Sequence, residues 1–345
     1  MDDILNDDID INSAWSTFCE EGNINDNYLM ENKKLSDTDI PKASEIYIST
    51  KTKIAYLNKS INLSKVFWNI KVIPYHKLDE GVVKKQMKFN FANEESVLEM
   101  TKRLENENNV DEQIISRIIN PNGRIKFKDI RKISIGLCQK DITSYRSKKR
   151  SAFYNCFVLL LRISQNDIFK EIHVKVFNTG KLEIPGIRDD NTLVLTLDLL
   201  VSILRQYSGD ETINYDLSKS ETVLINSNFN CGFYLNRDKL LDILKYKYKI
   251  DCVFDACQYP GIQCKYNYQN NDVEYKLSFM IFRTGSILIV GKCDEDILFK
   301  VYNYIKELLE TEYPNVNIIN TEANKSNITK PTSTKKNKKR IIYVS

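Results

Sequence analysis

The sequence has few of the residues and motifs on which most enzymes depend. Its 345 residues include only two histidines, His76 and His173, and His173 lies within an alternating strand pattern. The sequence contains neither a P-loop nor a glycine-rich dinucleotide-binding motif. Carboxylates are plentiful, but no spacing singles out a pair for acid–base catalysis. We therefore expect a binding protein rather than an enzyme, with no catalytic residue and no cofactor.

Metal-binding and membrane signals are also lacking. None of the eight cysteines forms a Cys-x-x-Cys pair, and Cys252, Cys257 and Cys264 are too far apart for a zinc finger or ribbon. We expect no metal site and mostly buried, free thiols. The apolar run at residues 157–161 is only of strand length, and no secretory signal is recognisable. The sequence therefore predicts an intracellular protein without a membrane partner.

Charge is distributed unevenly, although the net charge is only +4. Residues 1–43 carry eleven acids and three lysines, whereas residues 323–345 carry seven basic residues and no acid. Blocks of like charge are typical of disordered segments, so we expect a flexible acidic arm and a flexible basic tail. A basic tail on a mildly basic body favours a polyanionic partner, and a solubilising tail is the alternative. Residues 335–340, KKNKKR, also fit a nuclear import signal.

An internal repeat organises the rest of the chain. Shifted by 105 residues, VFNTGKLEIPG at 176–186 overlays IFRTGSILIVG at 281–291, with Phe177 on Phe282 and Gly180 on Gly285. The apolar positions of the flanking strands and of the following amphipathic helix, 191–207, keep the same phase. Each phrase reads as two antiparallel strands joined by a tight turn. Two such units predict an α+β fold with a shared antiparallel sheet and helices on one face.

Upstream, the offset between the repeats changes. Residues 44–57 alternate as a strand, and the short helix expected at 62–70 overlays 236–244 at an offset of 174. The difference predicts an insertion at about 71–140 in the first repeat, for which we expect helices at 93–106 and 111–119 and strands at 124–127 and 132–137. The predicted organisation is an arm (1–43), a first repeat (44–210), a second repeat (211–322) and a tail (323–345).

The duplicated hairpin motif resembles that of the TATA-box-binding protein family. The motif stands here as KVFNTGKLEIPGI and MIFRTGSILIVGK, and Tyr259-Pro260-Gly261 stands where the family has Phe-Pro-Gly. The resemblance covers about residues 44–72 and 145–312. The insertion and the first repeat look most like the divergent relatives encoded by large DNA viruses. The resemblance implies a pseudo-twofold saddle, with a curved antiparallel sheet and helices on its convex face.

The resemblance also implies a DNA-binding surface. Members of this family, a standard example of minor-groove kinking, place a concave sheet on the minor groove and wedge two aromatic rings per repeat between base steps. The matching wedge positions are Phe177, Phe282, Tyr259 and Tyr154, with Phe157 as the alternative to Tyr154 if the strand is shifted. Further groove-facing positions are Met280, Leu288 and Val290. Strand alternation alone adds Asn226, Asn228, Thr50 and Thr52. For every one of these residues, an ordinary place in a strand or in the core is the alternative.

The first repeat departs from the family pattern. Lys175, Glu183 and Pro185 stand at positions where the family is apolar or has threonine. A glutamate facing phosphate-lined walls opposes binding, so symmetric recognition of DNA is not expected.

Two functions fit these features. The first is an initiation factor that binds and bends AT-rich promoter DNA and recruits a general transcription factor of the TFIIB type and RNA polymerase. The second is a saddle without specific DNA reading that acts as an interaction scaffold in a transcription complex. An unrelated duplicated α+β module, including an unrecognised nuclease, is a third reading. We expect a location in the host nucleus, a viral factory or a virion if the protein is viral.

Overall fold

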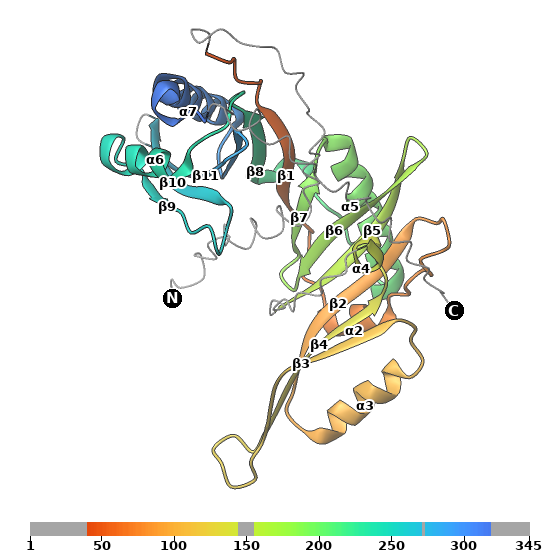
Figure 1. Ribbon diagram of the computed structural model, residues 1–345. Coiled ribbons are helices and arrows are strands. Elements are labelled where there is room, and N and C mark those ends of the chain that lie inside the picture. The colour runs from red at the N-terminus through yellow and green to blue at the C-terminus, as the bar shows by residue number, and fades with distance from the viewer. Residues whose placement is uncertain (1–39, 144–154, 271–272, 319–345) are drawn as a thin grey trace, which may run out of the picture. The chain divides into compact units, whose positions relative to one another are not determined.

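The chain divides into two compact units in the computed structural model. The structure describes residues 40–143, 155–270 and 273–318. Of the described residues, unit 1 comprises 40–49 and 223–318, and unit 2 comprises 50–222. In each unit the described residues form antiparallel strands and helices, as the sequence predicts for an α+β protein (Figure 1).

Unit 2 contains the larger part of the sheet. Its strand order is β3-β4-β2-β5-β6-β7-β1, with antiparallel neighbours throughout. Its elements are β1 (Tyr47–Tyr56, beginning in unit 1), α2 (Leu63–Asn69), β2 (Gly81–Phe91), α3 (Glu94–Leu104), β3 (Val110–Ile119), β4 (Phe127–Gly136), α4 (Gln139–Thr143), β5 (Cys156–Gln165), β6 (Ile168–Phe177), β7 (Lys181–Ile187), α5 (Asp190–Ser208) and the 3-10 helix η1 (Leu217–Lys219).

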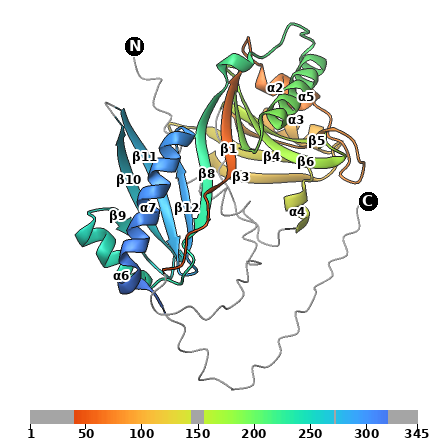
Figure 2. The same cartoon turned by 90° about the horizontal axis from the view of Figure 1, so that it is seen from above.

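Unit 1 repeats the same plan with fewer strands, in the order β8-β12-β11-β10-β9. Its helix α7 runs along one face of the strands (Figure 2). Its elements are β8 (Glu221–Asn230, beginning in unit 2), α6 (Arg237–Asp242), the π-helical turn η2 (Ile243–Lys247), β9 (Asp251–Val253), β10 (Gly261–Asn270), β11 (Val273–Phe282), β12 (Ser286–Gly291) and α7 (Glu295–Val316).

The same local devices recur in both units. Helix α2 begins at Asn62, whose side chain accepts from the Lys65 backbone N–H, and α6 begins in the same way at Asn236 with Lys239. The hairpin glycines, Gly180 and Gly285, have φ values of 89° and 82°. A Cβ at either glycine would lie within 2.5 Å of a backbone carbonyl oxygen, that of Lys59 or Phe233. Lys59 and Phe233 differ by the offset of 174, so the duplication extends to the contact that requires glycine.

The helices of each unit cover one face of its strands. In unit 2, alternate residues of β5, β6 and β7 pack with α2, α3 and α5 in one core. In unit 1, alternate residues of β8, β10, β11 and β12 pack with α6 and α7 in a second core. The other set of alternating residues faces away from the helices, which leaves one face of each unit's strands for a different purpose.

The structure confirms most expected elements and corrects others. The helices expected at 62–70, 93–106 and 191–207 are α2, α3 and α5. The helix expected at 111–119 is wrong, because this segment is strand β3, paired with β4. Its isoleucine pairs at 114–115 and 118–119 mimic helical spacing, but β-branched residues before an Asn-Pro-Asn-Gly turn favour a hairpin. Strand β2 was not predicted, since its three lysines hide the apolar pattern.

Strand β2 changes the meaning of the insertion. It lies beside β5 in unit 2, as β9 lies beside β10 in unit 1. The predicted insertion therefore includes one strand that has a counterpart in the other unit. The elements without a described counterpart are α3, β3, β4 and α4.

Candidate nucleic-acid interface

The helix-free face of unit 1 carries most of the predicted DNA-binding residues. The strand register places Asn228 beside Leu288 and Leu288 beside Met280, which forms one row across β8, β12 and β11. Asn226 and Val290 form the next row. Residues in register share a face of the sheet, so the three positions taken from the resemblance and the two asparagines placed by alternation lie on one face.

Six apolar side chains gather on this face in what we name the helix-free cluster. Its members come from strands and from the loop before β10, with no residue of a described helix. Three members are buried and three are half-buried at the rim. The buried members are Leu224, Met280 and Val290, and the rim members are Tyr259, Phe282 and Leu288.

The two aromatic rings of the cluster pack against each other over a glycine. The ring centroids of Tyr259 and Phe282 lie 5.9 Å apart, with an interplanar angle of 57°. A Cβ at Gly261 would lie 3.1 Å from Phe282 Cε1 and 3.2 Å from Tyr259 Cε1. These distances are shorter than ordinary van der Waals contact, so the absence of a side chain at Gly261 lets both rings approach the backbone.

The loop that carries Tyr259 is held by hydrogen bonds. The Asp255 carbonyl accepts from the Tyr259 N–H at 2.9 Å, and the Asp255 carboxylate accepts from the Cys257 N–H at 2.9 Å. Arg237 donates to the carbonyl of Pro260 and stacks over Phe254. These contacts from both sides of Tyr259 fix its position, as a residue that must meet a ligand surface requires.

Amides rather than carboxylates border the cluster on β8. Asn226 is buried, at 6% exposure, and Asn228 is half-buried. Strands β8 and β12 place leucine, valine, asparagine and serine on this face, and among their described residues Glu221 at the start of β8 is the only carboxylate. Such a surface combines apolar contact with hydrogen-bond donors and has little negative charge.

The corresponding face of unit 2 has a different chemistry. Lys175 and Glu183 stand at the places of Met280 and Leu288, and Lys175 Nζ lies 2.6 Å from Glu183 Oε1. Both side chains are largely buried, at 15% and 21% exposure. Pro185 replaces Val290 and has no backbone donor. The apolar surface of unit 1 is thus replaced by an ion pair in unit 2.

Phe177 is half-buried at the end of β6, where Phe282 ends β11. Its ring lies 5.8 Å from Lys181 Nζ. Cys156 pairs with Phe177 in the register, as Gly261 pairs with Phe282. The Cys156 thiol is buried, which raises its pKa to about 11. A side chain at this position removes the space that Gly261 leaves in unit 1.

Phe157, the alternative to Tyr154 as a wedge residue, does not lie on the helix-free face. It is completely buried in the helix-covered core, beside Val176 in the register, and therefore lies on the face opposite to Phe177. Tyr154 lies outside the described residues.

Of the two threonines predicted on β1, only one is at a position equivalent to one of the two asparagines on β8. Thr52, at 7% exposure, falls at an irregularity between Lys51 and Lys53, and Thr50 is half-buried. At the offset of 174, Thr52 matches Asn226, whereas Thr50 matches Leu224. Sequence reasoning missed Leu224, although its place two residues before Asn226 in the alternation of β8 was a sufficient signal.

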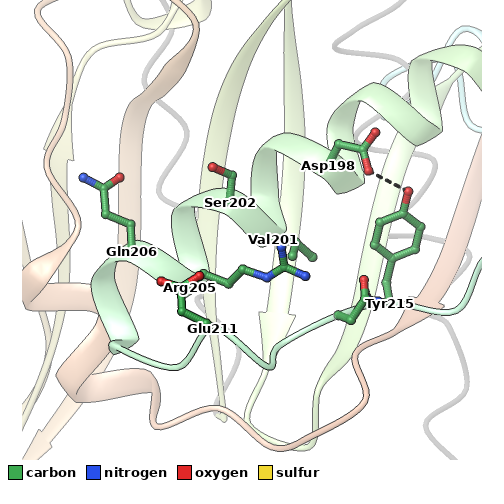
Figure 3. Close-up of a pocket in the computed structure, with 8 residues that line it drawn as sticks. Asp198, Val201, Ser202, Arg205, Gln206, Glu211 and Tyr215 are labelled. Atoms are coloured by element: carbon green, nitrogen blue, oxygen red, sulfur yellow. Dashed lines mark hydrogen bonds between the residues drawn. The ribbon is translucent and has the colours of Figure 1, made fainter.

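Unit 2 also has a polar cavity of about 770 Å³ beside α5 (Figure 3). Tyr215 donates to Asp198 at 2.8 Å, and burial together with this carboxylate raises the pKa of Tyr215 to about 12. No sequence motif pointed to this cavity. Its lining residues are Asp198, Val201, Ser202, Arg205, Gln206, Glu211, Asn214 and Tyr215.

Several features bear on other classes of site. The described residues include no group of three or more His, Cys, Asp or Glu side chains that could hold a metal ion. Within the same part of the chain, no helix is long and apolar enough to cross a membrane. The seven described cysteines are free thiols and all but Cys257 are buried, as the sequence predicts for them.

No family model matches the sequence. A curated protein of Acanthamoeba polyphaga mimivirus, named TATA-box-binding protein-like, is 26% identical over 208 residues, covering 54% of this chain and 56% of the viral protein. The chain thus spans just over half the length of this relative. Among solved structures, Methanococcus jannaschii TBP is similar at a TM-score of 0.39 and 12% identity, covering 78% of this chain and 99% of that one. The mimivirus relative confirms the resemblance that the two hairpin motifs predict.

Proposed function

We propose that this protein is a TATA-box-binding-protein-like transcription initiation factor that binds AT-rich promoter DNA through the minor groove and bends it. The helix-free cluster of unit 1 is the observation that carries the proposal. Tyr259 and Phe282 pack as an aromatic pair at its rim, and Asn226 and Asn228 border it. The similarity to the mimivirus protein, whose name refers to the TATA box, supports this class of function.

The chemistry of the minor groove matches this surface. A·T pairs present only acceptors there, whereas G·C pairs add the guanine amino group. An apolar surface with asparagine donors at its border therefore favours A·T steps and excludes the guanine amino group. Aromatic rings at the rim can enter between base steps, which costs a few kcal/mol per step for unstacking and allows a larger contact area.

Unit 2 contributes to binding in a different way. The Lys175–Glu183 ion pair on its corresponding face would have to be desolvated by DNA, and Glu183 would meet phosphate-lined walls. We propose that unit 1 supplies the AT preference and that the corresponding face of unit 2 supplies little of it. The protein partners would be a general transcription factor of the TFIIB type and RNA polymerase, with a location in the host nucleus or a viral factory.

A specific observation favours a second function. The same ion pair removes the apolar character of a whole face in unit 2, which suits a protein-interaction scaffold in a transcription complex better than a DNA reader. In that case DNA binding would be sequence-blind.

Energy transfer between dyes at the two ends of a short duplex tests the proposal. AT-rich and GC-rich duplexes are titrated with the full chain and with Phe282→Ala. We expect tight binding to the AT-rich duplex with the ends brought closer, and loss of both effects in the variant. Equal binding to both duplexes with no change in end-to-end distance would favour the scaffold.

A further inference from the structure

The distal part of the hairpin formed by β3 and β4 is basic. Over residues 113–128 the sequence has four basic residues and no acid. The next carboxylate along the chain, Asp129, is completely buried and bound by Arg131. The basic residues are Arg117, Arg124, Lys126 and Lys128.

Three of these charges have no ion-pair partner among the described residues. Arg117 lies 3.6 Å from the Asp129 carboxylate, but Arg124, Lys126 and Lys128 form no ion pair with any described residue. Arg124 and Lys126 are exposed and Lys128 is half-buried. Cationic side chains held together without a carboxylate partner favour an external anion.

The tip of the hairpin is apolar as well as basic. Ile119 and Ile125 are 54% and 48% exposed, on either side of the turn that contains Pro121. Exposed isoleucines at such density are unusual for a surface that faces only water. The turn is fixed, because Gly123 N–H donates to the Asn120 carbonyl and Asn120 N–H donates to the Lys126 carbonyl.

The hairpin is a two-stranded ribbon that projects from unit 2, a shape that can enter a groove. Strand β3 is at the end of the strand order of unit 2, and the β3–β4 loop projects beyond the other strands of the unit (Figure 1). The major groove of B-DNA is wide enough to admit a two-stranded ribbon.

We propose that the β3–β4 hairpin is a second DNA-binding element, separate from the helix-free cluster of unit 1. Arg124, Lys126 and Lys128 contact phosphates, and Ile119, Pro121 and Ile125 lie against the groove. The element strengthens binding without adding sequence preference, because phosphate contacts are the same for every sequence. This inference shares double-stranded DNA with the proposed function but does not require AT preference.

The test is a salt series with the full chain and a triple variant, Arg124→Gln, Lys126→Gln and Lys128→Gln. Fluorescence anisotropy is measured on AT-rich and GC-rich duplexes. Each lost phosphate contact lowers the salt slope of log K by about 0.9, so the triple variant should lose up to about 3 in slope on both duplexes. Lys65→Gln, Lys71→Gln and Lys102→Gln together, at exposed positions in or next to helices α2 and α3, form the matched control and should leave the slope unchanged.

A second variant examines the apolar tip. Ile119→Ser with Ile125→Ser should weaken binding severalfold on both duplexes with the salt slope unchanged. A triple variant that behaves like the control would overturn the inference. Sedimentation provides a second contrary result. If either hairpin variant lost a self-association that the unchanged protein shows, and kept its DNA affinity, the hairpin would be a protein interface and the inference would be overturned.

The two proposals fail in different ways. Sequence-blind binding whose salt slope falls in the triple variant would support the hairpin and contradict the AT-reading function. AT-preferring binding whose affinity and salt slope are unchanged in both hairpin variants would support the AT-reading function and contradict the role of the hairpin.

Discussion

Lys175 Nζ lies 2.6 Å from Glu183 Oε1, across neighbouring strands, at the two places where the duplicated unit has Met280 and Leu288. One repeated pattern thus has two chemistries in one chain. The apolar version keeps the surface that the proposed minor-groove contact needs, and the charged version does not. The asymmetry between the units, more than the duplication itself, determines what the protein is expected to do.

Replacing the ion pair with apolar residues should restore the missing surface. We expect Lys175→Met with Glu183→Leu to bind an AT-rich duplex several times more tightly than the unchanged protein. Either single substitution should be less stable than the double, because it leaves a largely buried charge without its partner. A double-mutant cycle of thermal unfolding should give a coupling of about 1 kcal/mol. Equal AT affinity for the double variant and the unchanged protein would contradict this role.

The equivalent phenylalanines should differ in their effect on DNA binding. Phe282→Ala removes one ring of the pair with Tyr259 and should weaken AT-rich binding about 10- to 100-fold, or about 1.4–2.8 kcal/mol. Phe177→Ala, beside Lys181 and the ion-paired face, should weaken it less than threefold. Anisotropy titration of both variants at one salt concentration measures the difference. Equal losses would mean that both units read DNA alike.

DNA affinity should fall as the side chain at position 261 becomes larger, although Gly261 itself is not expected to contact DNA. Gly261→Val places new atoms where the rings of Tyr259 and Phe282 now lie, so both rings must move. We expect a fall in AT-rich affinity of at least tenfold, with a smaller fall for Gly261→Ala. Circular dichroism should show an unchanged fold, because valine is favoured in strands. Full affinity in the valine variant would indicate that the ring arrangement is unimportant.

Acid should destabilise unit 1 through Glu312. This carboxylate is 1% exposed and accepts from Lys247, from Tyr248 Oη and from Asn315 Nδ2. The hydrogen bond from Lys247 is the largest of the causes that lower the pKa of Glu312 from 4.5. The unfolded chain therefore binds a proton at a higher pH than the folded chain. The stabilisation is present above about pH 4.5 and is lost as the pH falls through the folded pKa.

Glu312→Gln should remove this part of the pH dependence and cost about 1–3 kcal/mol at neutral pH. The exposed Glu307 on the same helix provides the control, as Glu307→Gln should change neither. Urea unfolding between pH 3 and 7 measures both effects. A variant with the same acid-induced loss as the unchanged protein would show that another group is responsible.

The sequence predicted those parts of the fold in which pattern and chemistry agree. The hairpin motif, the turn glycines and the amphipathic helix are local and occur twice, so their phase was visible. Met280, Leu288 and Val290 came from the family resemblance, and their positions agree with the period of two in a strand. Phe157 was predicted as a wedge only if its strand were shifted. The observed register pairs it with Val176, whose side chain faces the core.

The rest could not be predicted because equivalent places hold unlike residues. Lys85, completely buried on β2, donates to the Phe67 and Ile70 carbonyls at the end of α2. Cys252 on β9 makes the corresponding contact with Leu241 at the end of α6, at 3.9 Å. A lysine and a cysteine show no similarity in a sequence comparison. Burial lowers the pKa of Lys85, and Glu107, whose Oε1 lies 3.6 Å from Lys85 Nζ, opposes this effect.

Replacing base pairs while keeping the minor groove constant tests the central claim most directly. An I·C pair lacks the guanine amino group, so its minor groove resembles that of A·T while its major groove resembles that of G·C. If the helix-free cluster reads the minor groove, a duplex with I·C in place of A·T should bind within about threefold of the AT-rich duplex and should lose that affinity with Phe282→Ala. Binding of the I·C duplex at the level of the GC-rich duplex would contradict minor-groove recognition by this protein.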